Sequence, residues 1–152
     1  MRDGGEGIAR GVVAALAWAI IPAAVVAWLY HADLGHRRDY LGHYAAGYGG
    51  TLCALACGLV LVPRSVGARP RLWGIVGATL VCIGLGTITE ATIFRYAKFD
   101  PVDYCNQNLG AAFAGLIAAA HVTARPPSFF SLVGWLVTGL GFLWMGFHHA
   151  FR

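Results

Sequence analysis

The run LWGIVGATLVCIGLGTITEATIF, from Leu72 to Phe94, is long and apolar, and only Glu90 within it carries a charge. A helix needs about 20 such residues to cross the hydrocarbon core of a bilayer. The whole chain has the same character, because 58% of its residues are hydrophobic and 12% are charged. Soluble domains carry about 25% charged residues. We therefore expect an integral membrane protein.

Five apolar runs predict an all-α integral membrane protein, a bundle of about five transmembrane helices forming a single domain over residues 1–152. The expected spans are about 11–30, 42–62, 72–94, 103–121 and 129–148. The first run is longer than the usual core of a signal peptide, so we expect it to be retained. The fourth is short and holds the amides Asn106, Gln107 and Asn108, so a re-entrant or tilted segment is the alternative there.

The cations predict an orientation and argue against a nucleic-acid partner. The net charge is +4, but the basic residues are scattered between apolar runs, as charges that flank membrane spans are. With five spans, one side of the membrane holds Arg2, Arg10, Arg64, Arg69, Arg71 and Arg125. The other side holds Arg37, Arg38, Arg95, Lys98 and Arg152. Six against five favours an N-terminus inside and a C-terminus outside.

The acidic and histidine residues are distributed more unevenly than the cations. Five spans place most of them on one side, which the orientation above makes extracytoplasmic. These residues are Asp33, Asp39, Glu90, Asp100, Asp103, His31, His36, His43, His148 and His149. The pattern predicts that polar groups gather at one face of the membrane.

The sequence Asp100-Pro101-Val102-Asp103 is typical of a helix start. Asp100 would be the N-cap, Pro101 the first helical residue and Asp103 the third, and each of these choices satisfies or complements the exposed N–H groups. Capping by Asp100 is compatible with a functional role for Asp103.

Glu90 does not fit a capping role, because it lies inside the third span near the C-terminal end of the helix, where the helix dipole disfavours an anion. An acid within a span costs a few kcal/mol unless it faces the bundle or finds a partner. Candidate partners are Arg95, Arg38 and His43. Glu90 is therefore either a site residue or one half of a structural ion pair.

The second span adds His36, Asp39 and His43, which share a helical face if the helix begins that early. Histidine and carboxylate side chains together bind Zn²⁺ or act as general acid and base. The spacing matches no known metal motif, so we assign no metal site, and the cofactor requirement stays unknown.

Three motifs make the chain resemble the VanZ-like family of small bacterial integral membrane proteins, over roughly residues 39–115. They are DYLGHYAAGYG with Asp39 and His43, TEATIFR with Glu90 and Arg95, and DYCNQNLG with Asp103 and Gly110. Tyr40, Ile93 and Gln107 stand where the family usually has Lys, Gln and Asn. The resemblance implies a multi-pass protein of the bacterial cytoplasmic membrane with an envelope or lipid-linked role.

We therefore expect a polar site at the extracytoplasmic face, formed by Asp39, His43, Glu90, Arg95 and Asp103. Its ligand would be a lipid head group or a cell-envelope component, which the site would bind or act on. Whether the protein is an enzyme stays open, since no nucleophile motif is present. The alternative is a non-catalytic structural or accessory subunit of a larger membrane complex, in which the acids serve as helix caps and interhelical pins.

Overall fold

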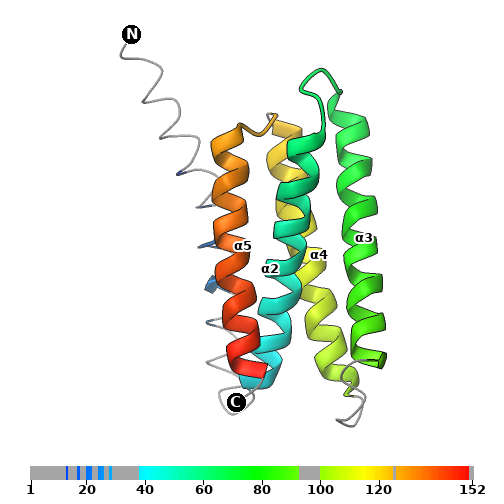
Figure 1. The fold of residues 1–152 in the computed structure, drawn as a ribbon, viewed down its shortest axis with the longest axis vertical. Helices are drawn as coiled ribbons and strands as arrows, with labels where there is room; N and C mark the ends of the chain where they lie inside the picture. The colour runs from blue at the N-terminus through cyan, green and yellow to red at the C-terminus, as the bar shows by residue number, and fades with distance from the viewer. Residues whose placement is uncertain are drawn as a thin grey trace.

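The computed structural model describes residues 38–92, 100–124 and 126–150, together with seven scattered residues between positions 13 and 28. The three continuous ranges form helices and connecting turns, and no strand is present among them. The helices are α2 (Arg38–Leu61), α3 (Ala68–Thr92), α4 (Pro101–Ala124) and α5 (Phe129–Ala150). They stand side by side with alternating direction, as Figure 1 shows.

The expected all-helical membrane fold is confirmed in its coarser form. Three helices are long and apolar enough to cross a membrane: Asp39–Leu61, Ala68–Thr92 and Phe129–His149. The expected count of five spans is not supported, because the described ranges form four helices. Seven residues of the first expected span, 11–30, are described and helical, and the rest of that span lies outside the described residues.

Helix α4 corrects the expectation for the fourth span, at 103–121. It is a continuous helix of 24 residues, about 36 Å at 1.5 Å per residue, which rules out a re-entrant segment. It is nevertheless not among the helices apolar enough to be candidate spans. The physical reason is its position, because it packs against both α2 and α3 and buries polar residues such as Asn106. A helix shielded by its neighbours need not be apolar all round.

Two glycines let α2 and α4 meet backbone to backbone. A Cβ atom added at Gly47 would overlap the backbone of Gln107, and one added at Gly110 would overlap the carbonyl of Tyr44. Small residues at such crossings are the usual means by which helices associate in lipid, where the hydrophobic effect no longer drives packing. The pair Gly47 and Gly110 therefore fixes how closely these two helices approach.

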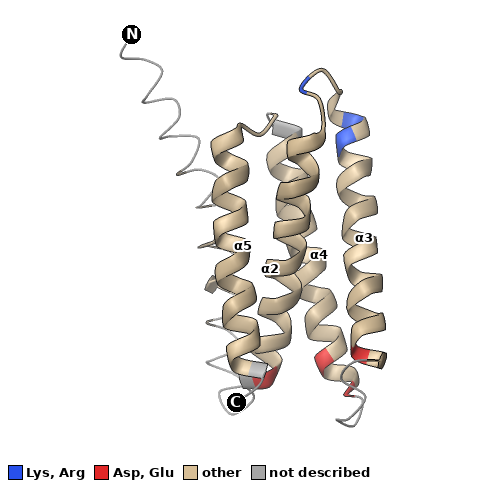
Figure 2. Cartoon of the chain, in the orientation of Figure 1, with Lys and Arg blue, Asp and Glu red and all other residues tan. Residues whose placement is uncertain are grey.

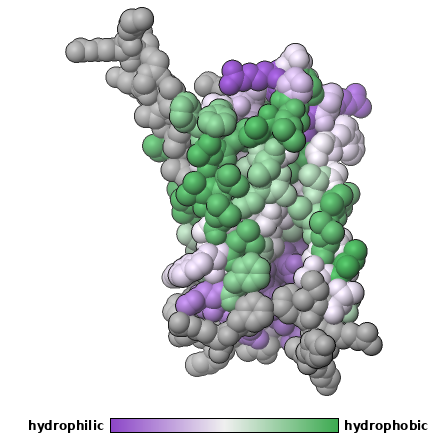
Figure 3. All heavy atoms as spheres, in the orientation of Figure 1, coloured by the Kyte–Doolittle hydropathy of each residue, from purple (hydrophilic) through white to green (hydrophobic). Residues whose placement is uncertain are grey.

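Helix α5 packs on another side of α2, and glycines again allow the two backbones to approach closely. A Cβ atom at Gly139 would lie 2.8 Å from the carbonyl oxygen of Gly49, so these backbones also approach closely. Around the contacts lies a core that includes fully buried Tyr44, Tyr48 and Trp135. The large exposed hydrophobic residues lie on outer faces instead, for example Leu80 and Val137, and Figure 3 shows hydrophobic residues over the middle of the face in view. Such a surface is compatible with contact to lipid.

Among the described side chains, acids and bases lie at opposite ends of the bundle, as Figure 2 shows. The described Lys and Arg side chains lie where α2 ends and α3 begins, and they are Arg64, Arg69 and Arg71. The described acidic side chains lie at the other end, and they are Asp39, Glu90, Asp100 and Asp103. The uneven distribution of acids inferred from the sequence is thus present in the described part of the fold.

Replacing Gly110 by Leu should destabilise the bundle, because the side chain would be forced into the backbone of α2. Overpacking of this kind costs about 1–3 kcal/mol and often more where backbone is the obstacle. Thermal unfolding of the purified protein in detergent, followed by circular dichroism, measures the loss. The matched control is Gly141→Leu on α5, where an added Cβ meets no atom within 4 Å. Equal losses in the two variants would contradict the close crossing.

Candidate functional site

His43 lies between two carboxylates that come from different helices. Its Nδ1 atom is 4.0 Å from Oε2 of Glu90 on α3, and its Nε2 atom is 3.6 Å from Oδ2 of Asp103 on α4. His43 itself belongs to α2, so three helices meet at one imidazole. We call these three residues the His43 cluster.

The His43 cluster is largely removed from solvent. The exposed fractions of the side chains are 17% for His43, 8% for Glu90 and 16% for Asp103. A protonated imidazole at this position forms an ion pair with each carboxylate, and low surrounding polarity strengthens both attractions. Oε2 of Glu90 is buried and has no hydrogen-bond partner in the described structure. That oxygen remains able to accept a hydrogen bond from a ligand.

The start of α4 holds a helix cap, Asp100, and a cluster residue, Asp103. Asp100 caps the helix, since its Oδ1 accepts a hydrogen bond of 2.8 Å from the backbone N–H of Val102. Pro101 is the first helical residue, which confirms the capping arrangement predicted from the sequence. Asp103, two residues into the helix, then points to His43. The same short segment thus contains both a cap and a member of the cluster.

The close contact of α2 and α4 at Gly47 and Gly110 fixes how the two helices are aligned along their axes, and so it determines that His43 lies opposite Asp103. Gly47 follows His43 by four residues, and Gly110 follows Asp103 by seven. Both spacings return to the same face of an α-helix. The faces that carry the glycines therefore also carry the two cluster residues, and the close crossing brings them together.

Gly86 on α3 helps to place Glu90 in the cluster. Gly86 lies one turn before Glu90 on the same face of α3, and a Cβ atom there would lie 3.1 Å from Cδ of Gln107. The missing side chain lets the end of α3 settle against α4. Of the partners expected for Glu90, His43 is the one that the described structure places beside it.

The other two predicted site residues are placed differently. Asp39 lies in the first turn of α2, four residues before His43, and is partly exposed. Arg95 lies outside the described residues, as do His36 and the side chain of Arg38. The structure thus brings together three of the five predicted residues, and their function stays a prediction.

A cavity begins one helical turn from the His43 cluster, because Gly47, Gly86 and Gln107 line it and each lies four residues from a cluster residue. The three cluster side chains themselves do not line it, and the sequence reasoning did not assign its lining to the site. It has a volume of about 290 Å³ and lies between α2, α3 and α4. Its lining includes Thr51, Thr89, Gln107 and Asn108 among small residues, and Oδ1 of Asn108 is buried with no hydrogen-bond partner in the described structure. The signal available in the sequence was the run of three amides inside an expected span.

The described residues contain no group of three His, Cys, Asp or Glu side chains arranged to hold a metal ion. The chemistry that these residues offer is hydrogen bonding and proton exchange at one imidazole and two carboxylates. No family model, curated protein or solved structure matches this chain. The argument for function therefore rests on the His43 cluster and the cavity one helical turn from it.

The contact between His43 and Asp103 predicts coupled effects on stability. We expect the free energies of unfolding of His43→Gln, Asp103→Asn and the double variant to be non-additive by about 0.5–3 kcal/mol, as for contacting charged residues. Chemical or thermal unfolding in detergent gives the four values. The control cycle pairs Asp103→Asn with His121→Gln, since His121 lies 18 residues further along α4 and packs against Trp135. Additivity in both cycles would contradict the contact.

Proposed function

We propose that this protein is a multi-span membrane protein that binds or acts on a lipid head group or cell-envelope component at the His43 cluster. The observation that carries the proposal is one imidazole held within 4.0 Å of two carboxylates from two other helices. Such a group is expensive inside a membrane protein and is usually kept for a purpose. A cavity of about 290 Å³, lined by residues one helical turn from the cluster, offers room for part of a ligand.

The chemistry of the cluster favours a ligand that donates hydrogen bonds. Two carboxylates and one imidazole carry at most one positive charge against two negative ones, so a bare phosphate would be repelled. Ammonium and hydroxyl groups suit the carboxylate oxygens, because they donate and the carboxylates accept. Head groups with amines or sugars carry such donors, and they lie at the depth where helices leave the hydrocarbon core.

The proposed orientation places the cluster on the extracytoplasmic side. The end of the bundle with Arg64, Arg69 and Arg71 would face the cytoplasm, as short loops rich in arginine do. A first span over residues 11–30 would then leave the N-terminus inside and the C-terminus outside. The resemblance to the VanZ-like family, whose motifs here include His43, Glu90 and Asp103, supports a bacterial cytoplasmic membrane as the location.

The same three residues could serve a catalytic role or a purely structural one, and the two roles predict different effects of mutation on ligand binding. A histidine next to a carboxylate is suited to general acid–base chemistry on a bound lipid. In the alternative, a structural or accessory subunit, the ion pairs of His43 only hold helices together. Retention of ligand binding by a cluster variant distinguishes these cases, since an interhelical pin contributes to stability and not to binding.

Glu90→Gln should weaken binding of an amine-bearing lipid at least about tenfold, or about 1.4 kcal/mol, because the amide removes a charged acceptor. Native mass spectrometry of the purified protein titrated with phosphatidylethanolamine, and with phosphatidylcholine as a comparison lipid whose head group donates no hydrogen bond, measures the change. The matched control is Asp100→Asn, which alters an acid at the same end of the bundle that caps α4. Equal affinity of Glu90→Gln and the unmodified chain would favour the accessory subunit.

Single cysteines test the orientation in a background without the four native ones. Ser65→Cys, in the exposed turn between α2 and α3, should react with a membrane-impermeant maleimide only after the cells are opened. Val102→Cys, exposed at the start of α4, should react in intact cells. The reverse labelling pattern would place the His43 cluster on the cytoplasmic side.

A further inference from the structure

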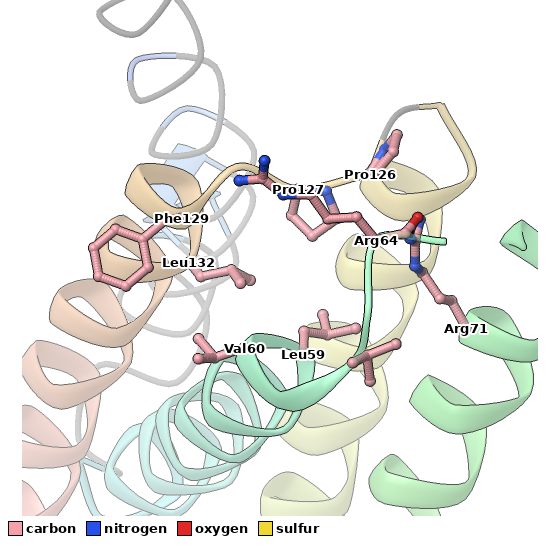
Figure 4. Close-up of a pocket in the computed structure, with 9 residues that line it drawn as sticks. Leu59, Val60, Arg64, Arg71, Pro126, Pro127, Phe129 and Leu132 are labelled. Atoms are coloured by element: carbon pink, nitrogen blue, oxygen red, sulfur yellow. Dashed lines mark hydrogen bonds between the residues drawn. The ribbon is translucent and has the colours of Figure 1, made fainter. Parts of the chain in front are cut away.

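The end of the bundle opposite the His43 cluster contains a cavity of about 130 Å³. It lies where the turn after α2 and the start of α5 meet, and its lining includes Arg64, Arg71, Pro127 and Phe129. Figure 4 shows Arg64 and Arg71 at the rim of this cavity, above Leu59 and Val60. We call it the arginine cavity.

Arg71 is buried, with 7% of its surface exposed. In the described structure its hydrogen bonds run from Nη2 to two backbone carbonyl oxygens, 3.4 Å to Pro63 and 2.5 Å to Arg64. These neutral acceptors orient the guanidinium without balancing its charge. The fork of donors on Nε and Nη1 remains for an anion.

No described acidic side chain lies near the arginine cavity, because the described acids are all at the other end of the bundle. A buried charge without a counter-charge is costly, whereas a bound anion would offset that cost. Arg64, which lines the same cavity, adds a second positive charge. The start of α5 adds to the field, since Phe129 is its first residue and helix N-termini favour anions.

An apolar groove adjoins the arginine cavity, which indicates that the bound anion also carries a hydrophobic part. It has a volume of about 300 Å³ and runs between α2 and α3 past Leu55, Gly58 and Ile75. Leu59, Val62 and Arg71 line both spaces. The Arg71 guanidinium thus stands where the arginine cavity passes into an apolar groove, an arrangement that suits an anionic amphiphile.

We propose that the arginine cavity binds the phosphate of an anionic lipid and that the groove between α2 and α3 receives its hydrocarbon chain. This lipid site is separate from the His43 cluster and lies at the opposite membrane face. A planar guanidinium binds phosphate oxygens in pairs, and the hydrocarbon chain gains from the apolar lining of Leu55 and Ile75. The site does not depend on what the His43 cluster binds.

The test is native mass spectrometry of the purified full chain, titrated with phosphatidic acid, phosphatidylcholine and inorganic phosphate. We expect one phosphatidic acid to bind at least about tenfold more tightly than phosphatidylcholine, and Arg71→Gln to remove that preference. Arg69→Gln is the matched control, because Arg69 is exposed on the first turn of α3 and lines neither space. Equal loss in Arg69→Gln and Arg71→Gln would reduce the effect to a diffuse surface charge and overturn the proposal.

Two further variants keep the test decisive if Arg71→Gln fails to fold. Arg64→Gln, in the exposed turn, should weaken phosphatidic acid binding several-fold. Gly58→Leu should fill the groove, since no atom lies within 4 Å of an added Cβ there, and should weaken binding of phosphatidic acid but not of inorganic phosphate. Inorganic phosphate binding as tightly as the lipid would overturn the lipid assignment. Unchanged lipid binding in both variants would overturn the site itself.

Discussion

The close approach of α2 to its neighbours is the constraint on which the rest of the structure depends. Gly47 and Gly110 allow the backbones of α2 and α4 to touch, and Gly49 and Gly139 do the same for α2 and α5. In lipid, hydrocarbon gains little by moving from one apolar surface to another, so such contacts replace hydrophobic burial as the source of packing. Once these backbones are in contact, the positions of the facing side chains along the helix axes are fixed relative to one another.

The His43 cluster follows from that geometry and explains why an acid is tolerated in α3. Glu90 would be costly in a helix that stood alone in lipid. Here it lies at the end of α3 nearest the interface, faces α2 and α4, and shares an imidazole with Asp103. The cluster thus provides the partners that make the burial of Glu90 possible.

Much of this arrangement could be predicted from the sequence, because the length of an apolar run indicates a membrane span and an acid near a span either caps a helix or needs a partner. The helices α2, α3 and α5 match the expected spans within a few residues, and the capping role of Asp100 is confirmed. The predicted site residues His43, Glu90 and Asp103 come together, although the sequence alone could not show that they converge. Arg95 lies outside the described residues, so its part in the site stays a prediction.

The errors have physical causes that a single sequence does not reveal. The three amides of α4 suggested a re-entrant or tilted segment, yet its shielded position lets it carry polar residues that a lipid-facing helix would not. The arginines near Arg71 were counted only as markers of orientation. Hydropathy does not show that one of them is buried beside a cavity, since that depends on how the turn between α2 and α3 folds back over it.

The shielded position of α4 has a consequence for how the protein reaches its fold. The amides of this helix are costly in lipid until a neighbouring helix covers them. Because α2 and α3 precede it in the chain, both covering surfaces are made before α4 emerges from the ribosome. The order of the helices in the sequence thus places both covering surfaces ahead of the helix that needs them.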